Sequence, residues 1–432
     1  MGLANTPGST RSASRKSQSH YYDLIVVGGG PGGVPAAIAA ARNGARVLLV
    51  ERYGFLGGMA TTGLVNPYMS FRAGEKVIIK GLFEELLNML AENGALLRDR
   101  QHFEAEAMKW LLDEWCLQNG VDLLLHAFAT GVRMKDSVIE AVEVHHKGGR
   151  EAIAADLFID STGDGDIAAL AGAPFEIGRT EDGACQPMTT CFRMANVDTE
   201  RVPSRKDVNT LYDKAKEAGE VKNPRENVLF FSSVNPAVIH FNTTRIIGKS
   251  ALSAQSLTEA ELIGRQQIKE MVRFLKSSVP GFENAYLMKI APQIGIRESR
   301  RISGHYALTA DDLLSARKFD DAIGCGSYGI DIHNPGGTGT VIKHLQPGEW
   351  YQIPYRSLIP QKISNLLIGS RCISSTHEAH SAIRIMPIVA AIGQAAGTAA
   401  ALSKQKGIFP VELNPGDLRS TLLRQKAFLS NE

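Results

Sequence analysis

The stretch from Tyr22 to Glu51 reads YDLIVVGGGPGGVPAAIAAARNGARVLLVE, and it decides the fold of this chain. Its apolar run at 22–27 is short and rich in branched side chains, which is typical of a buried parallel strand. The Ala-rich segment at 34–43 predicts a helix that stops at Gly44, and 46–50 predicts a second buried strand. The order strand, glycine turn, helix, strand predicts a βαβ unit of a Rossmann-type domain.

The glycines of this stretch have the spacing of a dinucleotide-binding turn. Gly28 allows the chain to leave the strand, Gly30 lets backbone approach a pyrophosphate, and Gly33 lets the helix pack on the strand. Phosphates would then lie at the helix N-terminus, where free N–H groups and the helix dipole favour anions. Glu51 ends the second strand and can accept hydrogen bonds from ribose hydroxyls, with Arg52 expected beside the adenosine. The fingerprint alone does not separate FAD from NAD.

Three further loops favour the longer cofactor. LGGMATTG at 56–63 follows the acidic strand end, DSTGDGD at 160–166 follows a distant strand, and RCIS at 371–374 follows a third strand near the C-terminus. A long cofactor that crosses the edge of a sheet needs several such loops at the carboxyl ends of strands. We therefore expect FAD.

Several stretches together resemble the FAD-dependent oxidoreductases of the glutathione-reductase-like superfamily. More narrowly, the chain looks like the bacterial FAD-dependent oxidoreductases related to the flavin subunit of heterodisulfide reductase. The resemblance covers residues 22–402 and rests on LGGMATTGLV, DSTGDGDIA, IGIRESRRISGHY, QIPYRSLIP, NLLIGSRCIS and GQAAGTAAAL.

The resemblance implies a set of cofactor contacts. Glu51 would hold the ribose, 57–61 would follow the pyrophosphate and flavin ring, 162–164 would close on the cofactor, and Arg371 would lie near the ribityl or pyrophosphate. The expected FAD-binding residues are Gly28, Gly30, Pro31, Gly32, Gly33, Glu51, Arg52, Gly57, Gly58, Met59, Ala60, Thr61, Phe128, Ala129, Thr162, Gly163, Asp164, Arg371, Gly393 and Gln394. Any one of these side chains could instead serve packing.

The chain also departs from the disulfide reductases of that superfamily. The region shortly after the acidic strand end, which reads MATTG, contains no cysteine. No second glycine fingerprint opens a nicotinamide-binding domain, and iron–sulfur motifs are absent from the sequence. We therefore expect a small-molecule substrate to react directly at the flavin, with oxygen, a quinone or another protein as electron acceptor.

Four residues are candidates for catalysis. Arg297, in the RESRR run at 297–301, could hold an anionic substrate or the cofactor, or else the run forms an internal ion-pair network with Glu298. His377 and His380 share a helical face with Arg384 and could move a proton, or be structural. Tyr328 could stack on flavin or donate to an oxyanion, or pack. HEAH at 377–380 is one residue short of a zinc motif, so we predict no metal.

Composition limits the other classes of function. The net charge of +2 gives no field for gathering nucleic acid, and we expect no nucleic-acid partner. The richest apolar stretch, 388–402, is mostly Ala and Gly and suits a buried helix, so we expect no stable membrane insertion. The first twenty residues lack the apolar run of a secretory signal, although a weak transit-peptide reading stays open. We expect a cytoplasmic protein, and a homo-oligomer stays open.

The predicted fold class is α/β. We expect a disordered tail at 1–20, a discontinuous FAD-binding domain at 21–175 and 355–432, and an α+β substrate domain at 176–354. The first domain should have a parallel central sheet and an antiparallel meander at 131–144 and 151–155, a separate strand at 157–160, and a long helix at 381–403. The pattern at 237–243 predicts a strand and that at 258–276 a helix.

The function predicted from the sequence is an FAD-dependent oxidase or dehydrogenase for a small polar organic substrate. An alternative is a flavoprotein electron-transfer subunit that requires a partner protein. A third hypothesis, from another class, is a flavin-binding protein that has a structural or sensing role and no catalytic turnover.

Overall fold

The structure is a computed structural model that describes residues 21–429. Its largest sheet has seven strands, and the order is β5 (Asp122–Leu124), β2 (Val47–Val50), β1 (Tyr21–Val27), β8 (Gly149–Asp160), β7 (Val138–His146) and β6 (Phe128–Lys135), with β19 (Leu366–Ile368) also paired to β8. Strands β5, β2, β1, β8 and β19 run parallel, whereas β6 and β7 are antiparallel. The predicted α/β class, with a parallel centre and an antiparallel meander, is confirmed.

Strand β8 corrects one boundary. The sequence pattern suggested separate strands at 151–155 and 157–160, but Gly149–Asp160 is one continuous strand. Its first half pairs with β7 and its second half with β1 and β19. The half that pairs with β7 has an alternating apolar pattern, whereas the half between β1 and β19 is continuously apolar. In the sequence, this change of pattern resembles the boundary between two strands.

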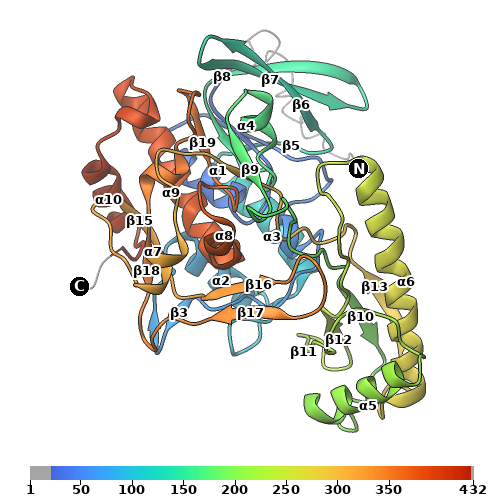
Figure 1. The fold of residues 1–432 in the computed structure, drawn as a ribbon. Coiled ribbons are helices and arrows are strands. Elements are labelled where there is room, and N and C mark those ends of the chain that lie inside the picture. The colour runs from blue at the N-terminus through green and yellow to red at the C-terminus, as the bar shows by residue number, and fades with distance from the viewer. Residues whose placement is uncertain (1–20, 430–432) are drawn as a thin grey trace, which may run out of the picture.

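Helices α1 (Gly33–Arg42) and α9 (Met386–Lys406) pack against each other in the larger part of the molecule (Figure 1). Their backbones touch, since a Cβ on Gly393 or Gly397 would lie 2.0 Å from the Gly32 oxygen or 1.9 Å from the Ala36 oxygen. The other helices of this part are α2 (Leu82–Glu92), α3 (Ala105–Gln118), α4 (Asp166–Leu170), α7 (Ala310–Leu314), α8 (His377–Ile383) and α10 (Pro415–Arg424).

The predicted helix at 381–403 is wrong in one respect, because it is two helices. Helix α8 ends at Ile383, Ile385 is extended, and α9 begins at Met386 with Pro387 in its first turn. Proline has no N–H to donate to the preceding turn, so it starts a helix well and interrupts one from within. The break sets Arg384 between the two helices.

Within residues 21–429, α9 is the helix whose length and hydropathy would suit a membrane span, and 89% of its most apolar window is buried inside the molecule. Its apolar composition is accounted for by its position against α1 and β15 (Ala322–Gly326).

A second sheet has its own core. Its strands are antiparallel in the order β11 (Phe230–Ser232), β12 (Ile239–Phe241), β10 (Phe192–Ala195) and β13 (Tyr286–Ile290). Helices α5 (Arg205–Glu217) and α6 (Ala254–Ser278) accompany it at the lower right of Figure 1. Phe192, Phe241 and Tyr212 are fully buried there. The strand and helix predicted at 237–243 and 258–276 are both present.

Four further pairs of antiparallel strands lie outside these two sheets. They are β9 (Phe175–Ile177) with β14 (Arg300–Ile302), β15 with β18 (Tyr351–Pro354), β16 (Ile330–His333) with β17 (Thr340–Lys343), and β3 (Arg72–Ala73) with β4 (Lys76–Val77). Buried side chains of 302–353, including Phe319 and Tyr351, join the larger core rather than that of the second sheet. The position of the domain boundary stays a prediction.

Candidate cofactor and substrate site

The glycine turn has the geometry that a dinucleotide requires. Gly28 has a φ of +101°, and a Cβ there would lie 2.4 Å from the Ser161 oxygen. A Cβ on Gly33 would lie 1.7 Å from the Gly28 oxygen, so helix and strand meet with no room for a side chain. A Cβ on Gly30 would meet nothing closer than the Gly58 Cα at 3.7 Å. Gly30 therefore leaves one face of the turn free for a ligand.

Glu51 fixes this turn through hydrogen bonds to backbone. Its Oε2 accepts from the Gly29 N–H at 2.7 Å, and its Oε1 accepts from the Tyr53 N–H at 3.0 Å. The side chain is buried, which raises the pKa of Glu51, while the backbone donors act in the opposite direction. A carboxylate has acceptor capacity beyond two bonds, so Glu51 can also accept from a ribose hydroxyl.

A cavity that is partly open to solvent starts at this turn. Twelve predicted cofactor residues line it: Gly28, Gly30, Pro31, Gly32, Glu51, Arg52, Gly58, Met59, Thr162, Gly163, Asp164 and Arg371. Phe128 and Ala129 line an adjoining hollow shared with Glu51 and Arg52, and Gly57 and Ala60 line an apolar one shared with Gly30 and Pro31.

The remaining predicted cofactor residues lie elsewhere. Thr61 is buried, and its Oγ1 donates to the Leu56 oxygen at 2.7 Å. Gly33 and Gly393 serve close backbone packing. Gln394 does not line the cavity, because its Oε1 accepts from the Leu82 N–H at 3.0 Å at the start of α2. That contact satisfies one of the free N–H groups that every helix N-terminus has.

Asp160 organises the loop that follows β8, a role that sequence reasoning missed. Its Oδ1 accepts from the Thr162 N–H at 3.1 Å and hydroxyl at 2.7 Å, and its Oδ2 accepts from the Ala168 N–H at 2.9 Å. Complete burial raises the pKa of Asp160 to about 6 despite these donors. The signal available in the sequence was an acidic residue at the end of a predicted buried strand.

Asp164 in the same loop is held from two directions. Its Oδ1 accepts from the Ser299 hydroxyl at 2.7 Å and from Arg371 Nη2 at 2.9 Å. Arg300 donates to the Asp164 carbonyl at 2.9 Å and to the Asp166 carboxylate at 2.8 Å. Part of the RESRR run therefore supports the wall of the cavity.

Sequence reasoning named Arg384 only as a neighbour of His377 and His380, and it missed four other cavity residues from the second half of the chain, namely Gln293, Ile296, Met386 and Val389. Gln293 Oε1 accepts from Arg52 Nη2 at 3.0 Å, which positions the arginine beside Glu51. No local pattern marks these residues, since only the folded chain brings them to the glycine turn.

Glu298 is the centre of a buried network. Its Oε1 accepts from Arg301 Nη1 and pairs with His377 Nδ1, both at 2.8 Å, and its Oε2 accepts from the Gln186 N–H at 3.0 Å. Burial opposes ionisation, yet His377, His380 and the Gln186 N–H hold the pKa of Glu298 below its ordinary value. Arg301 thus takes the ion-pair role, whereas Arg297 donates to the Pro187 oxygen, at 2.6 Å.

The predicted catalytic side chains do not line the cavity at the glycine turn. His380 is completely buried, and burial lowers the pKa of its imidazole to about 3, so His380 is neutral at ordinary pH. Tyr328 donates to Asp331 Oδ2 at 2.7 Å, and burial raises the pKa of its phenol. Catalytic roles for His377, His380, Arg297 and Tyr328 stay predictions.

Two findings concern metals and thiols. Residues 21–429 contain no group of three or more His, Cys, Asp or Glu side chains arranged to hold a metal ion. The five cysteines are free thiols, and burial raises the pKa of each. Thiols of this kind react slowly, because the thiolate is the nucleophile.

The fold and the glycine turn define a dinucleotide-dependent redox protein, and comparison with known proteins gives the family. The family described as FAD dependent oxidoreductase matches residues 23–422. The chain belongs to this family, and its cofactor is FAD. The open face at Gly30 and the carboxylate of Glu51 fit the adenosine diphosphate half of that cofactor.

Curated relatives match over limited stretches. A digeranylgeranylglycerophospholipid reductase of Methanococcoides burtonii is 28% identical over 153 residues, which is 33% of this chain and 38% of the relative. A soluble pyridine nucleotide transhydrogenase of an Enterobacter species is 42% identical over 64 residues, which is 15% of this chain and 14% of the relative. The match therefore spans well under half the length of these proteins.

Solved structures match over more of the chain. A geranylgeranyl bacteriochlorophyll reductase-like protein of Thermoplasma acidophilum covers 95% of this chain and 84% of its own, at 13% identity and a TM-score of 0.46. The flavin-dependent brominase Bmp2 covers 93% of this chain and 83% of its own, at 13% identity and a TM-score of 0.49.

Proposed function

We propose that this FAD-dependent oxidoreductase oxidises or reduces a small polar organic molecule directly at the flavin. Bound FAD supplies hydride or electron transfer, so the protein has to orient the substrate, exclude water and move a proton. The observation that supports the proposal is the extent of the cavity. It begins at Glu51, and its wall also includes Ile296, Arg384 and Met386.

Those three residues come from the part of the chain beyond the first βαβ unit. They line a part of the cavity wall that the glycine turn does not form. Arg384 offers a charged donor there, while Ile296 and Met386 are apolar. A mixed lining of this kind suits a small molecule with a polar group and a carbon framework.

The cysteines support direct chemistry. No cysteine lies between Arg52 and Met69, where a disulfide relay would need a pair, and burial raises the pKa of the Cys372 thiol near the cavity wall well above its usual range. We propose oxygen, a quinone or a protein as electron acceptor. The cytoplasmic location stays a prediction.

The experiment that tests the proposal uses the isolated protein loaded with FAD. Alcohols, amines and hydroxy acids are screened without oxygen for bleaching of the flavin absorbance, and the same compounds are then screened for turnover with oxygen or a dye. Bleaching followed by turnover supports the proposal. Reduction that occurs only after a second protein is added favours the electron-transfer subunit, and a protein that binds no FAD refutes both.

A further inference from the structure

Four arginine side chains gather where the β16–β17 hairpin meets the second sheet. Arg225 and Arg245 come from the loops before β11 and after β12, Arg297 precedes β14, and Arg384 lies between α8 and α9. Their side chains are largely buried, with exposed fractions of 6% for Arg225, 1% for Arg245 and 15% for Arg384. Buried arginines normally require a carboxylate partner.

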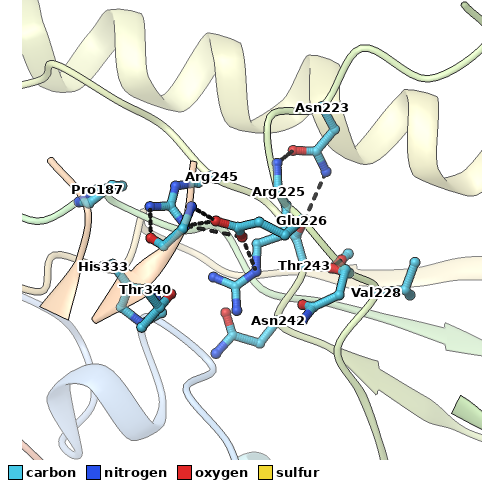
Figure 2. Close-up of polar contacts among 12 residues, drawn as sticks. Pro187, Asn223, Arg225, Glu226, Val228, Asn242, Thr243, Arg245, His333 and Thr340 are labelled. Atoms are coloured by element: carbon cyan, nitrogen blue, oxygen red, sulfur yellow. Dashed lines mark hydrogen bonds and ion pairs between the residues drawn. The ribbon is translucent and has the colours of Figure 1, made fainter. Parts of the chain in front are cut away.

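Arg245 has a structural role through both of its terminal nitrogens. Arg245 Nη1 donates to both carboxylate oxygens of Glu226, at 2.9 and 3.2 Å. Its Nη2 donates to the Asn334 and Gly339 carbonyls, at 3.1 and 2.9 Å, which ties the hairpin loop to the second sheet. Figure 2 shows Arg225 and Arg245 converging on Glu226, with dashed lines from Arg245 to the carboxylate.

Arg225 is different. Its closest carboxylate oxygen is Glu226 Oε2, which is 3.8 Å from Nε, and this buried Nε has no hydrogen-bond partner among residues 21–429. A buried guanidinium N–H without an acceptor loses its hydration with no compensation. This unpartnered N–H of Arg225 lies next to the polar side chains of Glu226 and Arg245.

Arg297 and Arg384 are also poorly compensated. Arg297 has one acceptor among the described residues, the Pro187 carbonyl. Arg384 Nη2 is 3.8 Å from Asp331 Oδ2 and 3.5 Å from the Asp331 carbonyl, while that carboxylate accepts a 2.7 Å bond from Tyr328. Elsewhere in the chain, buried Arg193 and Arg301 form contacts of 2.7–2.8 Å with Glu104 and Glu298.

The cluster therefore has excess positive charge. Four guanidinium groups face two carboxylates, Glu226 and Asp331, so two positive charges are uncompensated. Burial, together with the charges of Arg384 and Arg225, lowers the pKa of Arg297 to about 9. Burial and the same arginines also lower the pKa of His333, 3.9 Å from Asp331, which keeps its ring neutral.

We propose that Arg225, Arg297 and Arg384 bind an oxyanion of the substrate, a carboxylate or a phosphate. The inference rests on the proposed function, because it assumes that a substrate enters the cavity beside the flavin. Arg384 lines that cavity, so it connects the buried cluster to the space where the substrate would lie. Planar guanidinium forks match the paired oxygens of both anions.

The test uses the protein loaded with FAD, so that phosphate cannot enter the glycine turn. Acetate, malonate and inorganic phosphate are titrated at constant ionic strength, with the visible flavin spectrum and the melting temperature as two readouts. We expect saturable binding of at least one anion. The expected result for Arg225→Met is at least tenfold weaker binding, with Arg225→Lys between the two.

The control variant is Arg201→Gln. Arg201 lies in the same part of the chain and forms an exposed pair with Glu283 at 2.7 Å, so its loss should leave anion binding unchanged. If Arg225→Met fails to fold or to retain FAD, Arg384→Met replaces it and should show the same tenfold loss. The arms with malonate and phosphate identify which oxyanion the cluster prefers.

The outcomes separate the two proposals. Wild-type protein that binds no FAD refutes the proposed function. Wild-type protein that retains FAD but shows no saturable response to any of the three anions overturns this inference alone, as does equal binding by wild type and by the folded variants. A changed flavin reduction potential in Arg225→Met with unchanged anion binding would assign the cluster to the flavin, and also overturns the inference.

Discussion

Gly30→Ala separates the folding of the glycine turn from its role in binding FAD. The added methyl group would meet nothing closer than the Gly58 Cα, at 3.7 Å, and Gly30 does not have a positive φ. The FAD-free protein should therefore fold normally, and loss of glycine freedom in the unfolded chain could add about 0.4–1 kcal/mol of stability. The methyl group would instead occupy the face that the pyrophosphate approaches.

Forcing one methyl group into a tightly packed contact typically costs about 1–3 kcal/mol. We therefore expect FAD to bind Gly30→Ala about 5- to 150-fold more weakly than wild type. Affinity is measured by quenching of FAD fluorescence, and the stability of the FAD-free protein by scanning calorimetry. Both are measured on the same preparations.

The matched variant is Gly33→Ala, whose Cβ would lie 1.7 Å from the Gly28 oxygen. It should lower the melting temperature of the FAD-free protein as well as FAD affinity, because helix α1 could no longer pack on β1. Wild-type FAD affinity in Gly30→Ala would refute the assignment of this face to the cofactor. If FAD-free Gly30→Ala were less stable than the wild type, the face at Gly30 would not be open, and the variant could not distinguish an effect on folding from an effect on FAD binding.

Three further predictions concern buried polar groups. Glu298→Gln should cost about 3–5 kcal/mol in chemical unfolding, since it removes the buried carboxylate that pairs with Arg301 and His377 and leaves Arg301 only Glu176 Oε2, at 3.2 Å. Because the folded-state pKa of Glu298 lies below its ordinary value of 4.5, the wild-type advantage should be complete above about pH 4.5 and shrink as the pH falls below it; a constant difference from pH 3 to 7 would contradict this. Burial depresses the pKa of His380 from 6.5 to about 3, so the free energy of unfolding of the wild type should fall as the pH drops below 6.5, by up to about 1.4 kcal/mol per pH unit. His380→Leu should make this pH dependence less steep. Parallel curves of unfolding free energy against pH for the two proteins would exclude the effect. Asn365→Ala should cost about 2–4 kcal/mol, because Asn365 accepts from the Ile139 N–H and donates to the Ile139 and Asp156 carbonyls at 2.8–2.9 Å, whereas exposed Asn88→Ala should cost little; equal unfolding midpoints for the two variants would count against that role.

The amino-acid sequence by itself determined the βαβ unit, the glycine turn and the acid at the end of β2. Each of these depends on neighbours within about thirty residues, as the stretch from Tyr22 to Glu51 shows, so periodicity and turn chemistry are enough to predict them. The loops at 56–63, 160–166 and 371–374 were predictable for a related reason, because each directly follows or closely trails a buried strand.

Tertiary structure decided which polar groups meet. Arg301 and Arg297 lie four residues apart in one basic run, yet the fold gives Arg301 the carboxylate of Glu298 and leaves Arg297 with a carbonyl. Gln293 reaches Arg52 across 241 positions, and Gln394 reaches the start of α2 across 312. A local pattern indicates that a side chain is buried, but its partner is chosen by chain segments far away in the sequence.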